Sequence, residues 1–389
     1  MKARGLDLVA PGSSTVRPVS ASKWQPGQLL FVGFDGLEIP PELGKRIEAG
    51  RVGGVVLFRR NIEGPEQLRT LIRRLHELAP ADAPLTVAID QEGGRVQRLR
   101  EPWTEWPPMR TLGAGSVERT AMFARALALE LLDVGVDLDF APVVDVDSNP
   151  QNPVIGDRSF AADPAAVGRH AAAFIEAMEA AGVATCAKHF PGHGDTDLDS
   201  HLALPRLDLD RARLDRIELP PFRAVIAAKV ASIMTAHVLF PRLDPKRPAT
   251  LSPAVMGMLR DELQYDGLVF SDDVEMKAVA DHFSVEQRSL GVLEAGVDVI
   301  LACSQADLRE EILAKLERAP DSLLENGLRR LVAFKQRFGG TPRVVPITEL
   351  ASRRSAAEFG PPFRSHQALA EQLRAGQRSD DDHDPTERP

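Results

Sequence analysis

A chain of 389 residues can bury a sizeable hydrophobic core, and about 250 residues are enough for one α/β barrel. The formal net charge of −9 argues against a nucleic-acid-binding protein, because phosphate neutralisation needs a basic face and no long run of Lys and Arg is present. No stretch approaches the length of a membrane span, and the basic N-terminal residues are not followed by the apolar core of a signal peptide.

The two cysteines indicate the redox environment. Cys186 lies within an apolar run and Cys303 at the end of another, which predicts buried, reduced thiols rather than a disulfide framework. We therefore expect a cytoplasmic protein. We also expect it to be a monomer or a weak homo-oligomer that acts on a small molecule.

Strand-like segments begin after an irregular lead-in. Residues 1–26 mix Ser, Pro, Gly and basic residues without periodicity, which is typical of a poorly ordered terminus. Apolar runs with the length of buried strands then recur eight times. The runs are Leu29–Gly33, Gly54–Phe58, Leu85–Asp90, Leu138–Val144, Val183–Lys188, Ser232–His237, Leu268–Asp272 and Val297–Ala302.

Stretches of helical periodicity separate these runs, and several have Pro near the start, where its missing N–H costs nothing. They include Pro65–Leu78, Val117–Leu132, Pro164–Ala180, Pro253–Leu263 and Glu275–Glu294. Continuously apolar strands that alternate with helices predict a parallel sheet covered by helices. Eight such units favour an α/β fold of the (β/α)8 TIM type, a single domain over residues 27–338, with an open doubly wound sheet as the alternative.

Polar residues cluster where the predicted strands end. Active sites of barrels lie at the carboxyl ends of the strands, so this pattern favours the closed barrel. These residues are Asp90, Asp145 or Asp147, Lys188, His189, His237, Asp272 and Asp273. The turn Gly33–Leu37 is not a dinucleotide-binding fingerprint. Residues 339–389 are polar and Pro-containing, and we expect them to form a disordered tail that the barrel does not need.

The segment Lys188–His201 carries the densest proton-transfer chemistry in the chain. Asp199 and His201 stand two residues apart, so in extended backbone their side chains project to the same side. A carboxylate beside an imidazole gives a proton donor and acceptor that works near neutral pH. Two other interpretations stay open: an acidic surface loop, and a metal site built from His189, His193 and His201.

Asp272 ends an apolar run, where a carboxylate would be held rigidly at the barrel mouth, as a nucleophile requires. Asp272 or Asp273 could instead cap the following helix, and alternation along the strand does not choose between them.

The segment Asp90–Arg98 places carboxylates and guanidinium groups around a glycine pair after another predicted strand. We expect Asp90 and Arg98 to contact a ligand through bidentate hydrogen bonds, and Glu92 to pair internally with Arg95. Arg158, in a further loop, either reaches the ligand or braces that loop.

Taken together, the segments Asp90–Arg98, Lys188–Thr196, Asp199–His201 and Phe270–Met276 closely resemble glycoside hydrolase family 3, and within it the bacterial β-N-acetylglucosaminidase branch. The likeness extends over about Gln28–Phe338. It implies Asp272 as nucleophile and a dyad in which His201 is the acid/base and Asp199 its partner.

The resemblance also implies the sugar-binding residues Asp90, Arg98, Arg158, Lys188 and His189. It implies a retaining exo-β-N-acetylglucosaminidase without metal or cofactor, which acts on N-acetylglucosaminyl-1,6-anhydromuramyl peptides in cell-wall recycling. Within the family, a β-N-acetylglucosaminide phosphorylase or a β-glucosidase is the alternative. Outside it, the alternatives are a metal-dependent hydrolase that uses the histidine cluster and a non-catalytic sugar-binding barrel.

Overall fold

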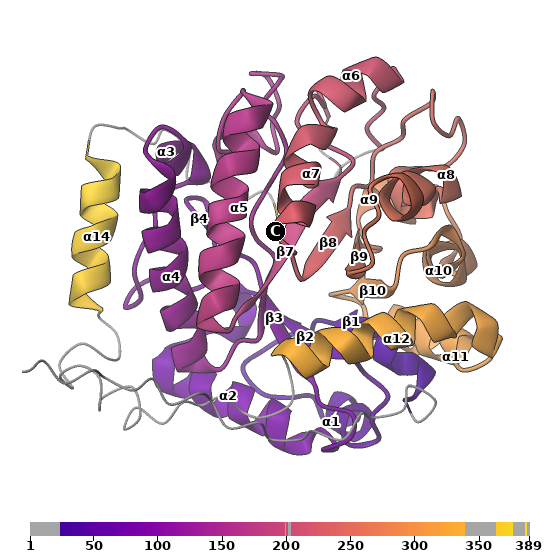
Figure 1. The fold of residues 1–389 in the computed structure, drawn as a ribbon. Helices are drawn as coiled ribbons and strands as arrows, with labels where there is room; N and C mark the ends of the chain where they lie inside the picture. Colours follow the sequence, from indigo (N-terminus) through magenta and orange to yellow (C-terminus); the bar gives the residue numbers. More distant parts are fainter. Residues whose placement is uncertain (1–23, 199, 201–203, 339–362, 376–385, 387–389) are drawn as a thin grey trace, which may run out of the picture.

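The computed structural model describes residues 24–198, 200, 204–338, 363–375 and 386. Asp199 and His201 lie outside this part of the chain, as does nearly all of the N-terminal lead-in. Within it, eight parallel strands close into a barrel in the order β1-β10-β9-β8-β7-β6-β3-β2, surrounded by helices (Figure 1). The predicted (β/α)8 barrel is confirmed.

Each barrel strand falls within, or overlaps, one of the eight predicted apolar runs. The strands are β1 (Leu30–Val32), β2 (Gly54–Leu57), β3 (Thr86–Ile89), β6 (Leu138–Asp139), β7 (Ala184–Phe190), β8 (Ser232–Thr235), β9 (Leu268–Asp273) and β10 (Val299–Ala302). The antiparallel pair β4 (Gln91–Gly93) and β5 (Val96–Gln97) forms a hairpin directly after β3.

The described helices form the outer layer, and none of them is long and apolar enough to cross a membrane. Their bounds are α1 (Pro41–Glu48), α2 (Pro65–Leu78), α3 (Met109–Gly113), α4 (Val117–Val134), α5 (Pro164–Ala181), α6 (Arg211–Arg216), α7 (Leu219–Ala227), α8 (Pro253–Gly257), α9 (Lys277–Ala280), α10 (Val292–Ala295), α11 (Ala306–Leu316), α12 (Asp321–Phe338) and α14 (Arg364–Arg374).

One predicted helix, Glu275–Glu294, is broken into α9 and a second helical segment that ends in α10. The second segment begins with its own capping box: the Ser284 hydroxyl accepts from the Gln287 backbone N–H at 3.3 Å, and the Gln287 side chain accepts from the Ser284 N–H at 3.0 Å. This reciprocal pair satisfies backbone donors at a helix start, so it favours two helices over one.

Aromatic side chains from β1, from β9 and from the residue after β6 pack together in the barrel interior. The Phe270 ring meets Phe31 at a centroid distance of 5.1 Å and Phe140 at 5.4 Å, edge to face in both cases. All three residues are buried. The interior is therefore a packed core, and the space for a ligand lies at one end of it.

The C-terminal segment differs from the expectation of a disordered tail at one stretch. There α14 packs beside α3 and α4 (Figure 1). Its apolar side is short: Ala370, Leu373 and the preceding Phe363 are buried. His366 adds a 2.8 Å contact from its ring to the fully buried carboxylate of Glu130 on α4.

Candidate active site

A cavity of about 690 Å³, including its part open to solvent, lies at the carboxyl ends of the barrel strands. Its polar lining comes from the ends of β3, β7 and β9, from the loops after β6 and β7, and from one residue near the C-terminus. These lining residues are Asp90, Arg158, Lys188, His189, His193, Ser200, Asp272, Asp273 and Thr386.

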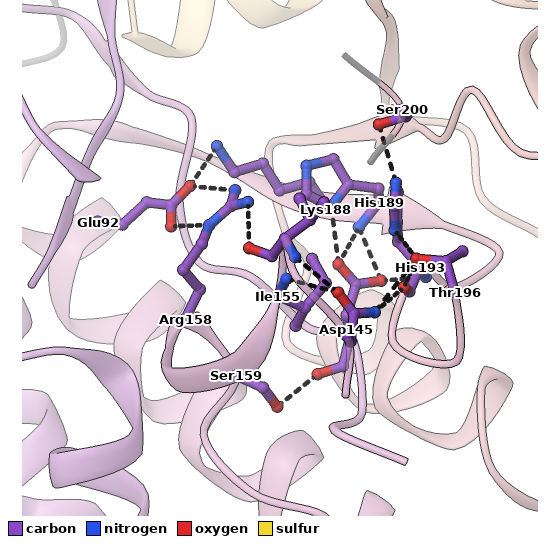
Figure 2. Close-up of polar contacts among 12 residues, drawn as sticks. Glu92, Asp145, Ile155, Arg158, Ser159, Lys188, His189, His193, Thr196 and Ser200 are labelled. Carbon is purple, nitrogen blue, oxygen red and sulfur yellow. Dashed lines mark hydrogen bonds and ion pairs between the residues drawn. The ribbon is translucent and has the colours of Figure 1, made fainter. Parts of the chain in front are cut away.

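Lys188 connects β7 with the end of β3 and with the hairpin that follows β3. It belongs to β7, and its ammonium group lies 2.8 Å from Asp90, which follows β3, and 2.7 Å from Glu92 in the hairpin (Figure 2). Only 2% of the Lys188 side chain is exposed. A buried ammonium group needs such partners, so the two carboxylates fix its position.

Glu92 binds a second cation, Arg158, in a bidentate arrangement with N–O distances of 2.9 and 2.8 Å. The expected pairing of Glu92 with Arg95 is wrong, because Arg95 pairs instead with Asp157 at 3.0 Å. Arg158, in the loop after β6, and Lys188, in β7, are both far from Glu92 along the chain, and both converge on its buried carboxylate.

Charge pairing sets the ionisation of this cluster. Burial alone would raise the pKa of Glu92, but Arg158 and Lys188 hold it well below its ordinary value. Burial would likewise lower the pKa of Lys188, and the carboxylates of Asp90 and Glu92 raise it instead. Glu92 and Lys188 therefore stay charged over the physiological pH range, and charged groups suit the recognition of sugar hydroxyls.

Arg98 lies behind Asp90 and is fully buried. Its guanidinium group contacts the Asp90 carboxylate at 3.4 Å and donates to the hydroxyl of Thr386 at 2.6 Å. It also lies over the Phe58 ring, 5.6 Å from the centroid. The two residues predicted to contact a ligand, Asp90 and Arg98, are thus in contact with each other.

Asp145 organises the two histidines of the β7 loop. Its buried carboxylate lies 2.7 Å from His189 Nδ1 and accepts from the His193 backbone N–H at 2.6 Å (Figure 2). The carboxylate fixes the His189 ring, so Nε2 is directed away from Asp145. Sequence reasoning noted that Asp145 follows a strand but gave it no role. The signal is the one that selected Asp90, an acidic residue directly after an apolar run.

Asp272 and Asp273 end β9 at the cavity, and both are partly exposed. Asp272 accepts from the Asp273 backbone N–H at 2.8 Å, whereas Asp273 accepts from the N–H of Glu275 at 3.0 Å, as in an Asx turn. Neither caps α9, whose N-cap residue is Met276. The buried His237 ring lies 3.0 Å from the Asp273 carbonyl oxygen and 2.8 Å from the Thr250 hydroxyl, which braces the end of this strand.

Residues 24–333 match the family model described as the glycosyl hydrolase family 3 N-terminal domain. The chain belongs to glycosyl hydrolase family 3. The expected family is confirmed, and with it the chemistry of a glycoside hydrolase.

The relatives narrow the comparison. The chain is 42% identical over 299 residues to a β-hexosaminidase of Thiobacillus denitrificans, covering 74% of this chain and 81% of the relative. Among solved structures, a family 3 β-N-acetylglucosaminidase from Paenibacillus has a TM-score of 0.81 at 39% identity, covering 90% of this chain and 67% of that one. NagZ from Neisseria gonorrhoeae, solved in complex with N-trifluoroacetyl-D-glucosamine, has a TM-score of 0.76 at 32% identity, covering 90% and 98%.

Most of the predicted site residues of this family 3 chain therefore meet at one cavity. Asp90, Arg158, Lys188, His189 and Asp272 line it, and Arg98 contacts Asp90. The predicted dyad lies outside the described residues, but Ser200, which stands between Asp199 and His201 in the sequence, lines the cavity.

The histidine cluster of the metal interpretation is occupied by other partners. Across the described ranges, no group of three His, Cys, Asp or Glu side chains is arranged to hold a metal ion. His189 is bound to Asp145, and the His193 ring contacts the hydroxyls of Thr196 and Ser200. His201 lies outside those ranges.

Proposed function

We propose that the chain is a retaining exo-β-N-acetylglucosaminidase, with a covalent glycosyl-enzyme on Asp272 and an acid/base dyad of His201 and Asp199. One observation carries the proposal. A family 3 barrel places Asp272 on the wall of the same cavity as the charged cluster of Asp90 and Lys188. The residues proposed as nucleophile and as sugar-binding groups thus share one site, which supports the proposal.

Two chemical steps follow from this arrangement. Asp272 attacks the anomeric carbon of the sugar while His201 protonates the departing glycosidic oxygen. His201, now neutral, then takes a proton from a water molecule that displaces Asp272, so the configuration at the anomeric carbon is retained. Asp199 orients the imidazole and stabilises its protonated form.

The sugar-binding roles rest on the geometry of the charged groups. Asp90, held by Lys188 and Arg98, presents its carboxylate to sugar hydroxyls, and His189 presents the nitrogen that Asp145 does not hold. Arg158 binds Glu92 through Nε and Nη2 and the Val154 carbonyl oxygen through Nη1, and it lines the same cavity, where it would contact the sugar.

For the substrate, we infer terminal β-linked N-acetylglucosamine, and by family resemblance N-acetylglucosaminyl-1,6-anhydromuramyl peptides from cell-wall recycling. The β-hexosaminidase relatives and the N-acetylglucosamine analogue in the gonococcal structure support the sugar. A cytoplasmic location is part of the proposal, and two buried free thiols, Cys186 and Cys303, accord with it.

The first test concerns the nucleophile. Asp272→Ala should abolish turnover of every β-N-acetylglucosaminide, whatever its leaving group, because the covalent intermediate cannot form. Asp273→Asn is the matched control, since the amide oxygen can still accept the hydrogen bond from the Glu275 backbone N–H. A fluorosugar that traps the intermediate should label Asp272, and a label on Asp273 would refute the assignment.

The second test separates the acid/base from the nucleophile. His201→Ala should lose about 10²–10⁴-fold on substrates with sugar leaving groups, which need a proton. Nitrophenyl release should stay comparatively fast, with a burst followed by slow turnover that azide partly restores. Asp199→Ala should show the same pattern more weakly. An equal loss on both kinds of substrate, without burst or azide effect, would contradict the dyad.

Two further measurements exclude the competing activities. Turnover of nitrophenyl N-acetylglucosaminide and glucoside with and without phosphate distinguishes hydrolysis from phosphorolysis, and N-acetylglucosamine from glucose. Exhaustive chelation should leave the rate unchanged. Loss of activity with EDTA that zinc restores would favour the metal hydrolase instead.

A further inference from the structure

The loops after β6 and β7 together contain a chain of four buried polar side chains that the proposed chemistry does not use. Asn152 Nδ2 lies 3.2 Å from the Thr196 hydroxyl, which lies 2.9 Å from His193 Nδ1. His193 Nε2 in turn lies 3.0 Å from the Ser200 hydroxyl (Figure 2). All four residues are buried, with at most 7% exposure. We call this chain the serine relay.

The donors and acceptors favour one direction along the serine relay. Asn152 Oδ1 accepts from the backbone N–H groups of Val154 and Ile155, at 2.9 Å each, so the amide nitrogen must face Thr196. The Thr196 hydroxyl then accepts from Asn152 and donates to His193 Nδ1. Of the two acceptors near the Thr196 hydroxyl, His193 Nδ1 at 2.9 Å is closer than the His193 carbonyl oxygen at 3.1 Å, which also accepts from Asn152 at 2.9 Å.

In this arrangement His193 holds its proton on Nε2, and this N–H donates a hydrogen bond to the Ser200 hydroxyl. This requires a neutral ring, because a protonated ring would point an Nδ1–H at the hydroxyl that donates to it. Burial, and the neighbouring His189, lower the pKa of His193 to about 4, so the ring is neutral at physiological pH.

Ser200 connects the serine relay to the proposed catalytic residues. It is held twice, by His193 at its side chain and by the backbone N–H of Ala278, 3.3 Å from its carbonyl oxygen. Asp199 and His201 are its covalent neighbours, each one Cα–Cα step of about 3.8 Å away. Whatever fixes Ser200 therefore limits where the two neighbours are.

We propose that His193 is a positioning residue for the acid/base dyad, and that its Nε2–H, oriented by Thr196 and Asn152, anchors Ser200 so that Asp199 and His201 are presented to the glycosidic oxygen. The inference rests on the proposed roles of Asp199 and His201. A buried histidine that only stabilised its loop would affect folding and all substrates alike, and this difference makes the two roles separable.

Ser200→Ala gives the direct test, because it removes only the acceptor of the His193 proton. Turnover of a β-linked disaccharide should fall by about tenfold to a hundredfold, since proton donation is misplaced. The burst of nitrophenol release should stay within about threefold of wild type, steady-state turnover should slow, and azide should restore part of it. Thr196→Val should give the same pattern more weakly.

Two variants of His193 supply the conservative comparison. His193→Gln places an amide N–H donor near the position of Nε2 and should recover most of the disaccharide activity, whereas His193→Leu has no donor and should match Ser200→Ala or exceed it. Should the leucine variant fail to fold, Ser200→Ala and Thr196→Val still carry the test, since each removes one hydroxyl.

His201→Ala, measured beside these variants, separates the two levels of inference. If it shows the leaving-group pattern while Ser200→Ala and His193→Leu lose activity equally on both substrates, or lose none, the positioning role is overturned and the proposed function stands. If His201→Ala lacks the pattern, the dyad itself is wrong and the positioning role is refuted with it.

Discussion

Two buried lysines at opposite ends of the barrel have different surroundings. Lys188, at the carboxyl ends of the strands, lies between the carboxylates of Asp90 and Glu92. Lys335, on α12, lies at the amino ends, where its ammonium group meets the Gln28 side-chain oxygen at 2.8 Å and two backbone carbonyl oxygens at 2.7 and 2.6 Å. Its nearby aromatic group is Trp24, 5.1 Å away.

The partners determine the charge. Neighbouring carboxylates raise the pKa of Lys188 despite its burial, whereas burial lowers the pKa of Lys335 to about 7, opposed only weakly by Asp137. At the carboxyl ends of the strands, the mouth of the barrel, paired charges are held in place for a ligand. At the amino ends, the base of the barrel, a lysine donates hydrogen bonds to groups that precede the strands. This matches the division between activity at the carboxyl end of a barrel and stability at the amino end.

The largest effect is expected at the mouth. Lys188→Met removes the ammonium group that Asp90 and Glu92 share and leaves Arg98 and Arg158 as their cationic partners. Breaking a buried ion pair costs up to about 3–5 kcal/mol. We expect kcat/KM to fall by about two to three orders of magnitude, measured with a nitrophenyl N-acetylglucosaminide. Lys45→Met, which breaks an exposed pair with Glu42, is the control and should change nothing. A near-normal Lys188→Met enzyme would break the comparison.

The next effect concerns α14, which supports the mouth from outside. Trp106, adjacent to His366, accepts from the Gly94 N–H at its carbonyl oxygen and donates its own N–H to Gln97, both in the hairpin region that follows β3. Ending the chain at Phe338 uncovers Trp106 and Glu130, so we expect a fall of several degrees in Tm and a several-fold loss in kcat/KM. Unchanged values would show that α14 is not needed, as expected from the sequence alone.

At the base, substitution should affect stability and not activity. Lys335→Met keeps the length of the side chain but removes the donor shared by Gln28 and two carbonyl oxygens, at an expected cost of roughly 2 kcal/mol at pH 9. Thermal unfolding should show the loss, and kcat/KM per folded molecule should stay within about twofold. A large loss of activity would show that the two ends of the barrel are coupled.

The same lysine predicts a pH dependence. Between about pH 7 and its ordinary pKa of 10.5, the unfolded chain holds a proton on Lys335 that the folded chain has released. The unfolded state then binds more protons, so stability rises with pH across this window and the advantage is lost as the pH falls towards 7. The Tm difference between wild type and Lys335→Met should therefore widen from pH 7 to pH 9.5. A constant difference would mean that Lys335 is charged throughout.

The sequence was sufficient for the barrel because its strands are buried on both faces and therefore read as apolar runs, from Leu30–Val32 to Val299–Ala302. Acidic residues directly after those runs then located the mouth. Pairings across the fold could not be read in this way: Glu92 and Arg158 are 66 residues apart, and nothing local distinguishes Arg158 from Arg95 as the partner.

Two local features were harder to predict for different reasons. The helix α14 has few buried apolar residues, and a polar contact between His366 and Glu130 on another helix completes its docking, so its own pattern is weak. The break before α10 was readable in principle, because Ser284 and Gln287 have the spacing of a capping box.

The smallest effect is expected from the last residues of the chain, at the mouth itself. Arg98 donates to the Thr386 hydroxyl at 2.6 Å, and Thr386 lies on the cavity wall. A sugar hydroxyl that binds Arg98 must displace this contact, so part of the enzyme is unavailable to substrate while it persists. Ending the chain at Ala375 keeps α14 and removes Thr386. We expect an unchanged Tm and a KM lowered by at most about fivefold, with Thr386→Ala intermediate. An increase in KM would instead show that Thr386 contributes to binding of the sugar.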